Sequence, residues 1–394
     1  MTVDDHPAFI DGEAVKLVMD LLSVHGRSGE EREIADLVVK YLSKAGVPAK
    51  FITHDQAHRK SRRGGQIGNL IVKLPETMRG PRRLLMAHLD TVPLCVGAQP
   101  IIRGDEIFSR DSSTALGGDN RAGCAVILNA LLSILRDGVP HPPLTFVWMV
   151  QEEVGLLGAR HVTTSKLGKP QLCFNWDGGP PNVAVIGATG DDHLDIEIEG
   201  LASHAGAHPE DGVSATVIAG LAIADLQKNG WHGKIVKGKQ QGTSNIGSIR
   251  GGDATNVVTD RLAITAEVRS HQPAFRKQII KAYEKAFRLA AKSVKNAQGQ
   301  TGRIRFSTYD KYESFRLSPK EPSVRAAMEA IESIGLPAMT RVIDGGLDAN
   351  WMTAHGFPTV TLGCGQAGIH TVNESLNIPD YLNACRIALR LATA

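Results

Sequence analysis

Residues 81–93, PRRLLMAHLDTVP, join an apolar run to two polar side chains that lie just beyond it. The run predicts a buried strand, and His88 and Asp90 follow its end. Two further runs repeat this arrangement, LTFVWMVQEE at 144–153 and QLCFNWDGG at 171–179. Their polar ends carry Glu152, Glu153 and Asp177. Because ligands gather outside the carboxyl ends of strands in open α/β sheets, the three runs predict one functional edge.

The surrounding elements indicate an α/β opening. Apolar residues recur at helical spacing over 34–42, after Ser28 and Glu31, which are spaced as in a capping box. Gly46 stands where a left-handed helix end is expected. Further strands are expected at 68–74, 83–87 and 357–363, and further helices at 122–135, 323–334 and 384–392. Helices alternating with strands in this way are typical of α/β folds.

The pattern changes after Asn182. Strands are expected at 193–200, 243–252, 260–270 and 303–315, and helices at 214–228 and 273–296. This order indicates a compact α+β insert of the split βαβ type. We therefore expect an α/β catalytic domain, with a mixed central sheet flanked by helices, from 1–187 and 317–394. An inserted domain at 188–316 interrupts it.

Composition excludes several classes of protein. The 394 residues include 44 basic and 41 acidic side chains and a net charge of +3, too balanced for a dedicated nucleic-acid binder. The basic run HRKSRR at 58–63 is expected to be a solvated loop, because no aromatic residue accompanies it. No apolar run approaches the roughly 20 residues that span a bilayer. An acidic start without a signal peptide and five scattered cysteines favour a cytoplasmic protein with reduced thiols.

Seven side chains at strand ends or turns form a candidate catalytic group: His88, Asp90, Asp119, Glu152, Glu153, Asp177 and His370. Five of them suffice to hold two divalent metal ions, and a bound hydroxide would complete the charge balance. One carboxylate must then bridge the two ions. Asp119 is the natural bridge, because the glycines of LGGDNRAG let the backbone turn sharply around it.

The spacing of the remaining residues indicates a division of tasks. Asp90 lies two positions after His88, so an extended chain points both the same way and lets Asp90 fix the His88 tautomer. Glu152 and Glu153 are adjacent, which suits one as a metal ligand and the other as acceptor of a proton from metal-bound water. The absence of cysteine from the group favours Zn²⁺, Co²⁺ or Mn²⁺ over a thiolate site.

The sequence resembles the dinuclear zinc exopeptidases that include peptidase T, glutamate carboxypeptidase, aminoacylase and succinyl-diaminopimelate desuccinylase. The matching segments are MAHLDTVP, GGDNRAG, QEEVGLLGAR, FNWDGG, GLASHAGAHPEDGVSA, GGDATNVVTD, EVRS and GIHTVNE. They span nearly the whole chain in the family's order. Two segments, GGLDAN and TLGCGQAGIHT, are most similar to peptidase T-like enzymes.

The resemblance implies roles for the catalytic group. His88 and Asp177 would hold one metal ion, Glu153 and His370 the other, and Asp119 would bridge them. Asp90 would orient His88, and Glu152 would act as base and proton shuttle. It further implies a cis peptide bond after Asp119. Asn120 and Arg121 depart from the family pattern, which leaves the metal preference open.

The resemblance also assigns roles to the inserted domain, which would be a lid or dimerisation domain. His204 matches a residue that stabilises the developing oxyanion, often from the partner subunit of a homodimer. Asn256 and Arg269 match positions that bind the substrate backbone or carboxylate. Asp348 of GGLDAN is a candidate partner for a substrate ammonium group, with a role in a turn as the alternative.

We therefore expect a metal-dependent, tripeptidase-like aminopeptidase that cleaves an amide bond in small peptides with a metal-bridging hydroxide and a glutamate base. Within hydrolases the alternative is a deacylase or carboxypeptidase acting on N-acyl amino acids. Outside them it is a metal-free peptide-binding protein on the same fold. A cysteine hydrolase using Cys124 or Cys364, or a nucleotide loop at 363–368, GCGQAG, has little local support.

Overall fold

The computed structural model describes residues 10–393, and the chain divides into two compact units. Among these residues, the first unit comprises 10–187, 315–343 and 347–393, and the second comprises 188–314 and 344–346. Residues 1–9, part of the acidic start considered above, lie outside the described residues.

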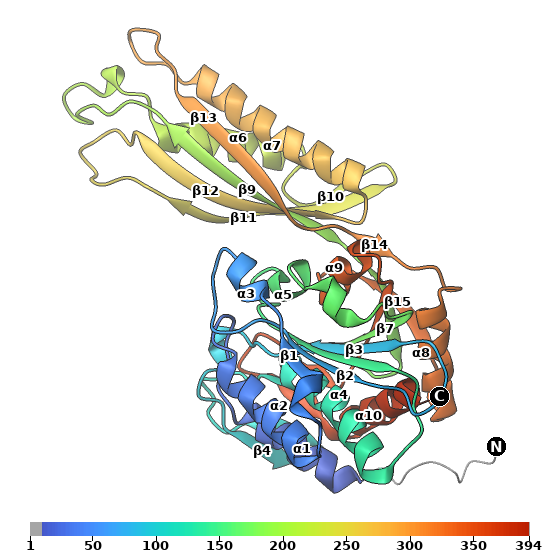
Figure 1. The fold of residues 1–394 in the computed structure, drawn as a ribbon. Helices are drawn as coiled ribbons and strands as arrows, with labels where there is room; N and C mark the ends of the chain where they lie inside the picture. Colours follow the sequence, from blue (N-terminus) through green and yellow to red (C-terminus); the bar gives the residue numbers. More distant parts are fainter. Residues whose placement is uncertain (1–9, 394) are drawn as a thin grey trace. The chain divides into compact units, whose positions relative to one another are not determined.

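A nine-stranded mixed sheet organises the first unit (Figure 1). Its strand order is β1 (Ile52–His54), β2 (Leu70–Leu74), β6 (Leu144–Met149), β3 (Arg83–His88), β7 (Leu172–Trp176), β16 (Thr359–Leu362), β8 (Val183–Ala188) and β14 (Phe315–Arg316), with β15 (Met339–Ile343) paired to β8. Strand β3 runs parallel to β6 and β7, and β7 runs parallel to β16. Four neighbouring strands therefore end at one edge, as the polar strand ends predict.

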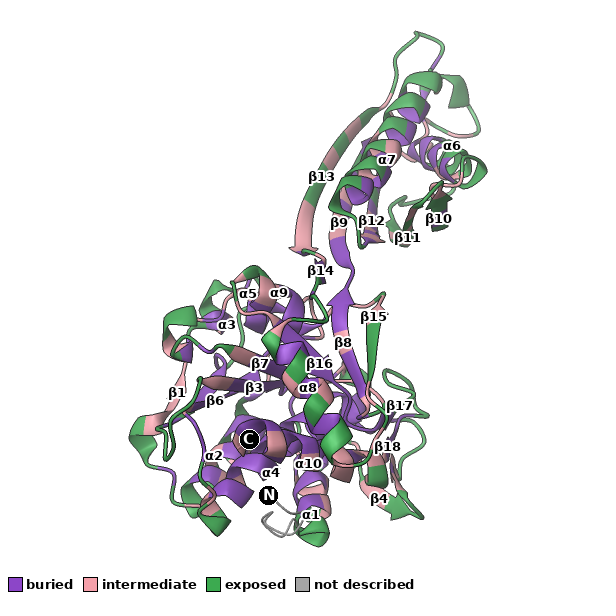
Figure 2. Ribbon diagram, turned by 90° about the vertical axis from the view of Figure 1, so that its right-hand side faces the viewer, coloured by how far each residue is buried: buried purple, intermediate pink, exposed green. Residues whose placement is uncertain are grey.

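Helices cover both faces of this sheet, which confirms the expected fold class. On one side lie α1 (Asp11–Leu22), α2 (Arg32–Lys44), α4 (Gly118–Asp137) and α10 (Ile378–Thr393), and on the other lie α5 (Leu157–Arg160) and α9 (Asp348–Ala354) (Figure 1). The remaining helices are α3 (Ala57–Lys60) and α8 (Pro322–Ser333). Helix α4 is buried along most of its length (Figure 2). It packs against β3 and β7, the strands that carry His88 and Asp177 at their ends.

The predicted capping box is wrong. Helix α2 begins at Arg32, and neither Ser28 nor Glu31 caps it with a side-chain hydrogen bond. The Ser28 hydroxyl instead donates to Asp90 (2.7 Å), and Glu31 accepts the backbone N–H of Gln151 (3.1 Å). Both side chains are engaged by the functional edge of the sheet, 60 to 120 residues away in sequence. Gly46, by contrast, has the expected positive φ of 84°.

Other elements were not expected from the sequence. Helix α1 and a four-stranded sheet of short strands were missed: β17 (Gln366–Ala367), β18 (Ser375–Asn377), β5 (Glu106–Ser109) and β4 (Pro100–Arg103). Helix α10 begins six residues before its expected start. Short, half-exposed strands carry too few apolar positions to produce a clear period.

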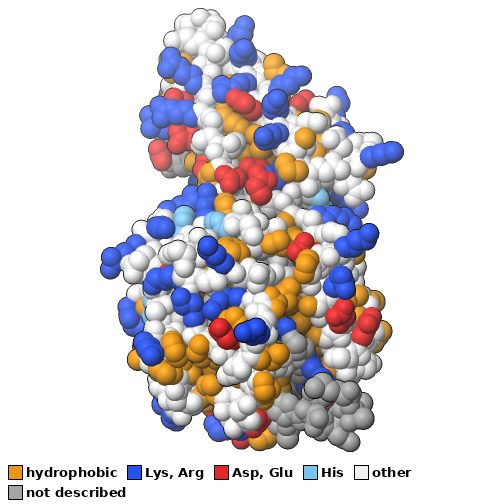
Figure 3. Space-filling model, turned by 45° about the vertical axis from the view of Figure 1, so that its right-hand side comes forward, with side chains coloured by type: hydrophobic (Ala, Val, Ile, Leu, Met, Phe, Trp, Pro, Cys, Tyr) orange, Lys and Arg blue, Asp and Glu red, His pale blue; other side chains and the backbone are white. Residues whose placement is uncertain are grey.

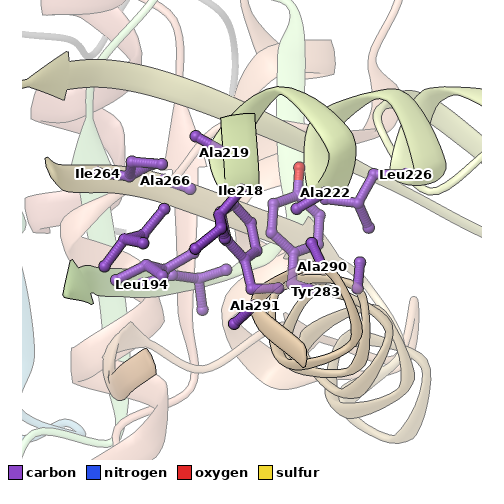
Figure 4. Close-up of a cluster of buried hydrophobic side chains, with 14 of the residues drawn as sticks. Leu194, Ile218, Ala219, Ala222, Leu226, Ile264, Ala266, Tyr283, Ala290 and Ala291 are labelled. Atoms are coloured by element: carbon purple, nitrogen blue, oxygen red, sulfur yellow. The ribbon is translucent and has the colours of Figure 1, made fainter. Parts of the chain in front are cut away.

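The second unit is a five-stranded antiparallel sheet backed by two helices. The strand order is β10 (Gly233–Lys237), β11 (Gln240–Arg250), β12 (Arg261–Ser270), β9 (Gly190–Glu199) and β13 (Arg303–Tyr312). Helices α6 (Ala215–Lys228) and α7 (Pro273–Ser293) share a buried apolar cluster with the sheet (Figure 4). Strand β10 was not expected. The Ser214 side chain caps α6 by accepting the N–H of Val217.

Among residues 10–393, no helix combines the length and apolar character needed to cross a membrane. The five cysteines are buried and free, as expected for reduced thiols.

Phe287→Ala should destabilise the protein by about 3–5 kcal/mol, because Phe287 on α7 is fully buried in the cluster of the second unit. Leu289→Ala on the same helix is the matched control, since Leu289 is 53% exposed. Urea unfolding followed by circular dichroism measures both. Equal effects of the two substitutions would contradict the assigned core.

Candidate metal centre

The polar residues predicted at the strand ends meet at one edge of the first unit's sheet. His88 is the last residue of β3, Asp177 follows β7, and Glu152 and Glu153 follow β6 by a short turn. Asp119 lies at the start of α4 and His370 in the loop between β17 and β18. The parallel strands bring the first four residues together, whereas Asp119 and His370 are placed by irregular backbone.

Five of these side chains form two groups that share one carboxylate. His88, Asp119 and Asp177 offer ligand atoms within 4.8 Å of one another, and so do Asp119, Glu153 and His370. The two oxygens of Asp119 divide between the groups. Oδ1 is 3.2 Å from His88 Nε2, and Oδ2 is 3.2 Å from His370 Nε2. Asp119 therefore faces both histidines at once.

A sharp backbone turn places Asp119. Gly117 has φ 81°, in the left-handed region, and the two residues that follow Gly118 depart from helical geometry although α4 continues beyond them. The Asp119–Asn120 peptide bond is cis, which confirms the implied geometry. Glu374 holds this turn by accepting the N–H groups of Gly117 (2.8 Å) and Asp119 (2.9 Å).

His88 is oriented from its far nitrogen. Its Nδ1 lies 3.0 Å from the backbone carbonyl of Asp90 and 3.5 Å from the Asp90 carboxylate. A donor Nδ1–H leaves Nε2 unprotonated toward Asp119 and Asp177, the tautomer that a metal ligand needs. The Asp90 carboxylate accepts the N–H groups of Glu152 (2.9 Å) and Glu153 (3.1 Å). Asp90 thus links the histidine to the turn that carries the two glutamates.

Glu152 and Glu153 differ in their surroundings. Glu153 reaches His370, with its two oxygens 3.0 and 2.9 Å from Nε2. Glu152 belongs to neither group of ligand atoms, yet it is buried beside them. Burial and the carboxylates of Asp348, Asp177 and Glu153 raise the pKa of Glu152 well above its usual range. The adjacent glutamates are therefore suited to two different tasks.

The electrostatics fit bound divalent cations. Burial and neighbouring carboxylates raise the pKa of Asp177 well above its ordinary value, and hydrogen bonds to Asp119 and Glu153 raise the pKa of His370 to about 10. Among the described residues, the three carboxylates of the two groups form ion pairs with histidine and with no Lys or Arg. A cluster of carboxylate and imidazole ligands that no Lys or Arg side chain neutralises suits Zn²⁺, Co²⁺ or Mn²⁺.

Asp348 faces the same region. It is the first residue of α9 and fully buried, and neither carboxylate oxygen has a hydrogen-bond partner among residues 10–393. Burial, together with repulsion from Asp90 and Glu153, raises the pKa of Asp348 to about 7. A carboxylate at a helix start is favourable, but that position supplies no partner for its oxygens here.

The other three predicted residues belong to the second unit. His204 is exposed, and its Nδ1 accepts the N–H groups of Gly206 (3.2 Å) and Ala207 (3.0 Å). The proton therefore lies on Nε2, which is a hydrogen-bond donor. Asn256 lies beside the same loop, because its carbonyl accepts the N–H of Ala205. Arg269 instead pairs with Glu267 (3.0 Å) and lies 3.6 Å from Asp191.

Three residues of the centre were not assigned from the sequence. Glu374 falls inside the quoted GIHTVNE segment, four positions after His370, but received no role. The sequence predicts Glu31 as part of a capping box. Gln151 lies within the strand predicted at 144–153, yet its φ is 57°. The left-handed conformation of a glutamine cannot be recognised from the sequence. The position of Glu374 within a quoted motif, by contrast, is a signal that could have identified it.

The alternative sites gain no support from the structure. Burial raises the pKa of the Cys124 thiol to about 12 and that of Cys364 well above its usual value, so neither is a ready thiolate. The GCGQAG segment contains β17 and runs into a loop, and no helix follows it within residues 369–377 of the described chain. A dinucleotide loop requires such a helix.

Known proteins resemble this chain throughout its length. Residues 84–394 match the family model described as Peptidase family M20/M25/M40. Peptidase T from Vibrio cholerae is 24% identical over 82% of this chain and 84% of its own. Two crystal structures, a tripeptidase from Staphylococcus aureus and the aminopeptidase PepT from Bacillus cereus, are 28% and 30% identical, with TM-scores of 0.87 and 0.83. Each comparison covers 98% of both chains. The chain therefore belongs to peptidase family M20/M25/M40, as a peptidase T-like metallo-exopeptidase.

Proposed function

We propose that this protein is a metal-dependent aminopeptidase that releases the N-terminal residue from small peptides, with tripeptides as the natural class. One observation carries the proposal: two ligand groups share Asp119, and a buried glutamate, Glu152, lies beside them without joining either. This arrangement combines sites for two cations with a free proton acceptor. The names of the similar tripeptidase and aminopeptidase support the substrate class.

In this proposal, His88 and Asp177 would hold one divalent ion and Glu153 and His370 the other, with Asp119, which belongs to both groups, as the shared ligand. The ions, which we expect to be Zn²⁺ with Co²⁺ or Mn²⁺ as alternatives, would supply Lewis acidity toward the scissile carbonyl and acidify water. Asp90 keeps Nε2 of His88 free for its ligand role through the contacts at Nδ1. Glu374 keeps the Asp119 turn in place.

Glu152 is the proposed base. Burial and neighbouring carboxylates raise the pKa of Glu152 well above its usual range, which makes its carboxylate a stronger acceptor for a proton of the attacking water. It then delivers that proton to the leaving amine. Nε2–H of His204 is the proposed donor to the developing oxyanion, because its Nδ1 is already occupied as an acceptor.

The inserted domain, for which the sequence predicts the bounds 188–316, corresponds to the second unit and is the proposed lid and dimerisation domain. Asn256 is the proposed contact for the substrate backbone. A small peptide is the only proposed partner besides a second copy of the chain. Basic and acidic side chains occur together on the face shown in Figure 3, consistent with the small net charge. We keep the cytoplasmic location as a prediction.

Asp348 and Arg269 favour an aminopeptidase over a carboxypeptidase or deacylase. An aminopeptidase must bind the ammonium group of its substrate, and Asp348 offers a buried carboxylate that has no partner among the described residues. A carboxypeptidase or deacylase must bind a substrate carboxylate, and Arg269 is already engaged by Glu267. A metal-free binding protein is disfavoured, because neither the proposed base nor any proposed ligand is missing.

Chelation should abolish hydrolysis of a tripeptide, and Zn²⁺ should restore it in the wild-type protein but not in Glu152→Gln. Loss of the base should lower kcat by about 10²–10⁴-fold while bound metal, measured by mass spectrometry, stays unchanged. Glu210→Gln, at an exposed glutamate, is the control. Turnover of Glu152→Gln within tenfold of wild type would remove Glu152 as the base.

A panel of free, N-acetylated and C-amidated tripeptides should show that a free N-terminus is required and a free C-terminus is not. Asp348→Asn should lower kcat/KM for the free peptide by about 10²-fold, the loss of a buried charge-assisted contact. Asp344→Asn is the control, because the Asp344 side chain is 92% exposed. Cleavage of the N-acetylated peptide as fast as the free one would favour the deacylase alternative.

His204→Ala should lower kcat by about 10²–10³-fold without changing the melting temperature or the metal content, since His204 is exposed. His208→Ala is the matched control, as an exposed histidine of the same loop. Steady-state kinetics with differential scanning fluorimetry measure these effects. An unchanged kcat in His204→Ala would exclude the oxyanion role.

A further inference from the structure

The turn that carries the two glutamates is held by carboxylates from elsewhere in the chain. Three consecutive N–H groups, those of Gln151, Glu152 and Glu153, point at carboxylate oxygens. Asp90 accepts two of them, and Glu31 accepts the first, from Gln151, at 3.1 Å. The direction in which Glu152 and Glu153 leave β6 thus depends on two buried acids.

Gln151 lies two residues beyond the end of β6, and its φ of 57° is unfavourable for a residue with a side chain. Such a conformation costs about 1–2 kcal/mol and persists where surrounding contacts determine it. The Gln151 side chain is fixed at both ends, by the Ser61 hydroxyl on Oε1 (2.7 Å) and the Gly64 carbonyl on Nε2 (2.6 Å). Gly65 is required here, because a Cβ would lie 2.4 Å from Nε2.

Glu31 is the group that holds the backbone of Gln151, by accepting its N–H. It is fully buried, and Oε1 accepts the N–H groups of Gly29 (2.6 Å) and Gln151, while Oε2 has no hydrogen-bond partner in the part of the chain that the structure describes. Within the described chain it forms no ion pair. A buried carboxylate with half its acceptors unused is a costly choice for stability alone. Helix α2 does not require it, since the Glu31 side chain makes no capping bond.

We propose that Glu31 is a positioning residue that holds Gln151 in its left-handed conformation and so directs Glu152 and Glu153 toward the metal centre. Glu31 acts through the backbone N–H of Gln151. The inference rests on the proposed function, because it assumes that the two glutamates serve as base and metal ligand. Residues that support a metal ligand in this way typically contribute 10–100-fold to metal affinity or activity.

Two substitutions separate this role from a merely structural one. Glu31→Gln keeps an acceptor oxygen for Gln151, and Glu31→Met fills the same space without an acceptor. Glu30→Gln is the matched control, because the Glu30 side chain is only partly buried and pairs with Arg27 and His25. Each protein is titrated with Zn²⁺ alone against a chelating dye, and kcat and KM are measured on a free tripeptide. The melting temperature of the metal-free protein is recorded.

Glu31→Met is expected to lose about 10–100-fold in Zn²⁺ affinity or kcat, with KM little changed and the metal-free melting temperature maintained or raised. Glu31→Gln and Glu30→Gln should stay within about threefold of wild type, well below that loss. Equal behaviour of Glu31→Met and Glu31→Gln would overturn the proposal. If wild-type protein binds none of Zn²⁺, Co²⁺ and Mn²⁺ in the same titration, the proposed function fails, whereas wild-type binding with unaltered Glu31→Met rejects this inference alone.

If Glu31→Met does not fold, Ser61→Ala tests the same turn by removing the hydroxyl that holds the Gln151 side chain. A loss of Zn²⁺ affinity or kcat with unchanged KM supports the proposal that the contacts of Gln151 position the two glutamates. Unchanged affinity and kcat in Ser61→Ala would overturn it.

Discussion

Burial of several carboxylates at the edge where the parallel strands of the mixed sheet end is the constraint on which the first unit depends. Each such group must find donors or cations, because an unpaired buried charge is strongly unfavourable. The protein meets this requirement in two ways. The groups around Asp119 face histidines and, in our proposal, divalent ions. The groups behind them, Asp90, Glu31 and Glu374, accept backbone N–H groups of the turns that carry the first set.

By accepting backbone N–H groups, Asp90, Glu31 and Glu374 restrain turns that no regular secondary structure holds. Asp119 and Glu152 both lie on turns with unusual dihedral angles nearby, at Gly117 and Gln151. Turns of this kind are mobile unless several hydrogen bonds fix them, and a metal ligand or base must be held within a fraction of an ångström. Backbone donors captured by buried acids provide that restraint. Acidic side chains therefore serve two purposes, as proposed metal ligands or base and as acceptors that hold the turns.

Substrate preference follows from a second contrast in the use of charge. Asp348 leaves both oxygens without a partner beside the candidate metal centre, whereas Arg269 is already paired within the second unit. An unpaired buried carboxylate favours a cationic substrate group, and an engaged guanidinium is less available to an anionic one. This contrast is the physical basis for proposing that the peptide's free amino group is recognised.

By itself, the sequence indicated the fold class and the central strands, because long apolar runs with polar ends are typical of α/β strands whose ends carry ligands. Its motifs, in their order along the chain, carried the resemblance to the family. It also indicated Asp119 as the shared carboxylate from the glycines around it. Tertiary structure alone decided what Ser28 and Glu31 do, since a local capping pattern competes with acceptors needed 60 to 120 residues away. It likewise decided the left-handed Gln151, the clamp by Glu374 and the unpaired state of Asp348. Hydrogen bonds between distant turns depend on three-dimensional proximity, which no local periodicity records.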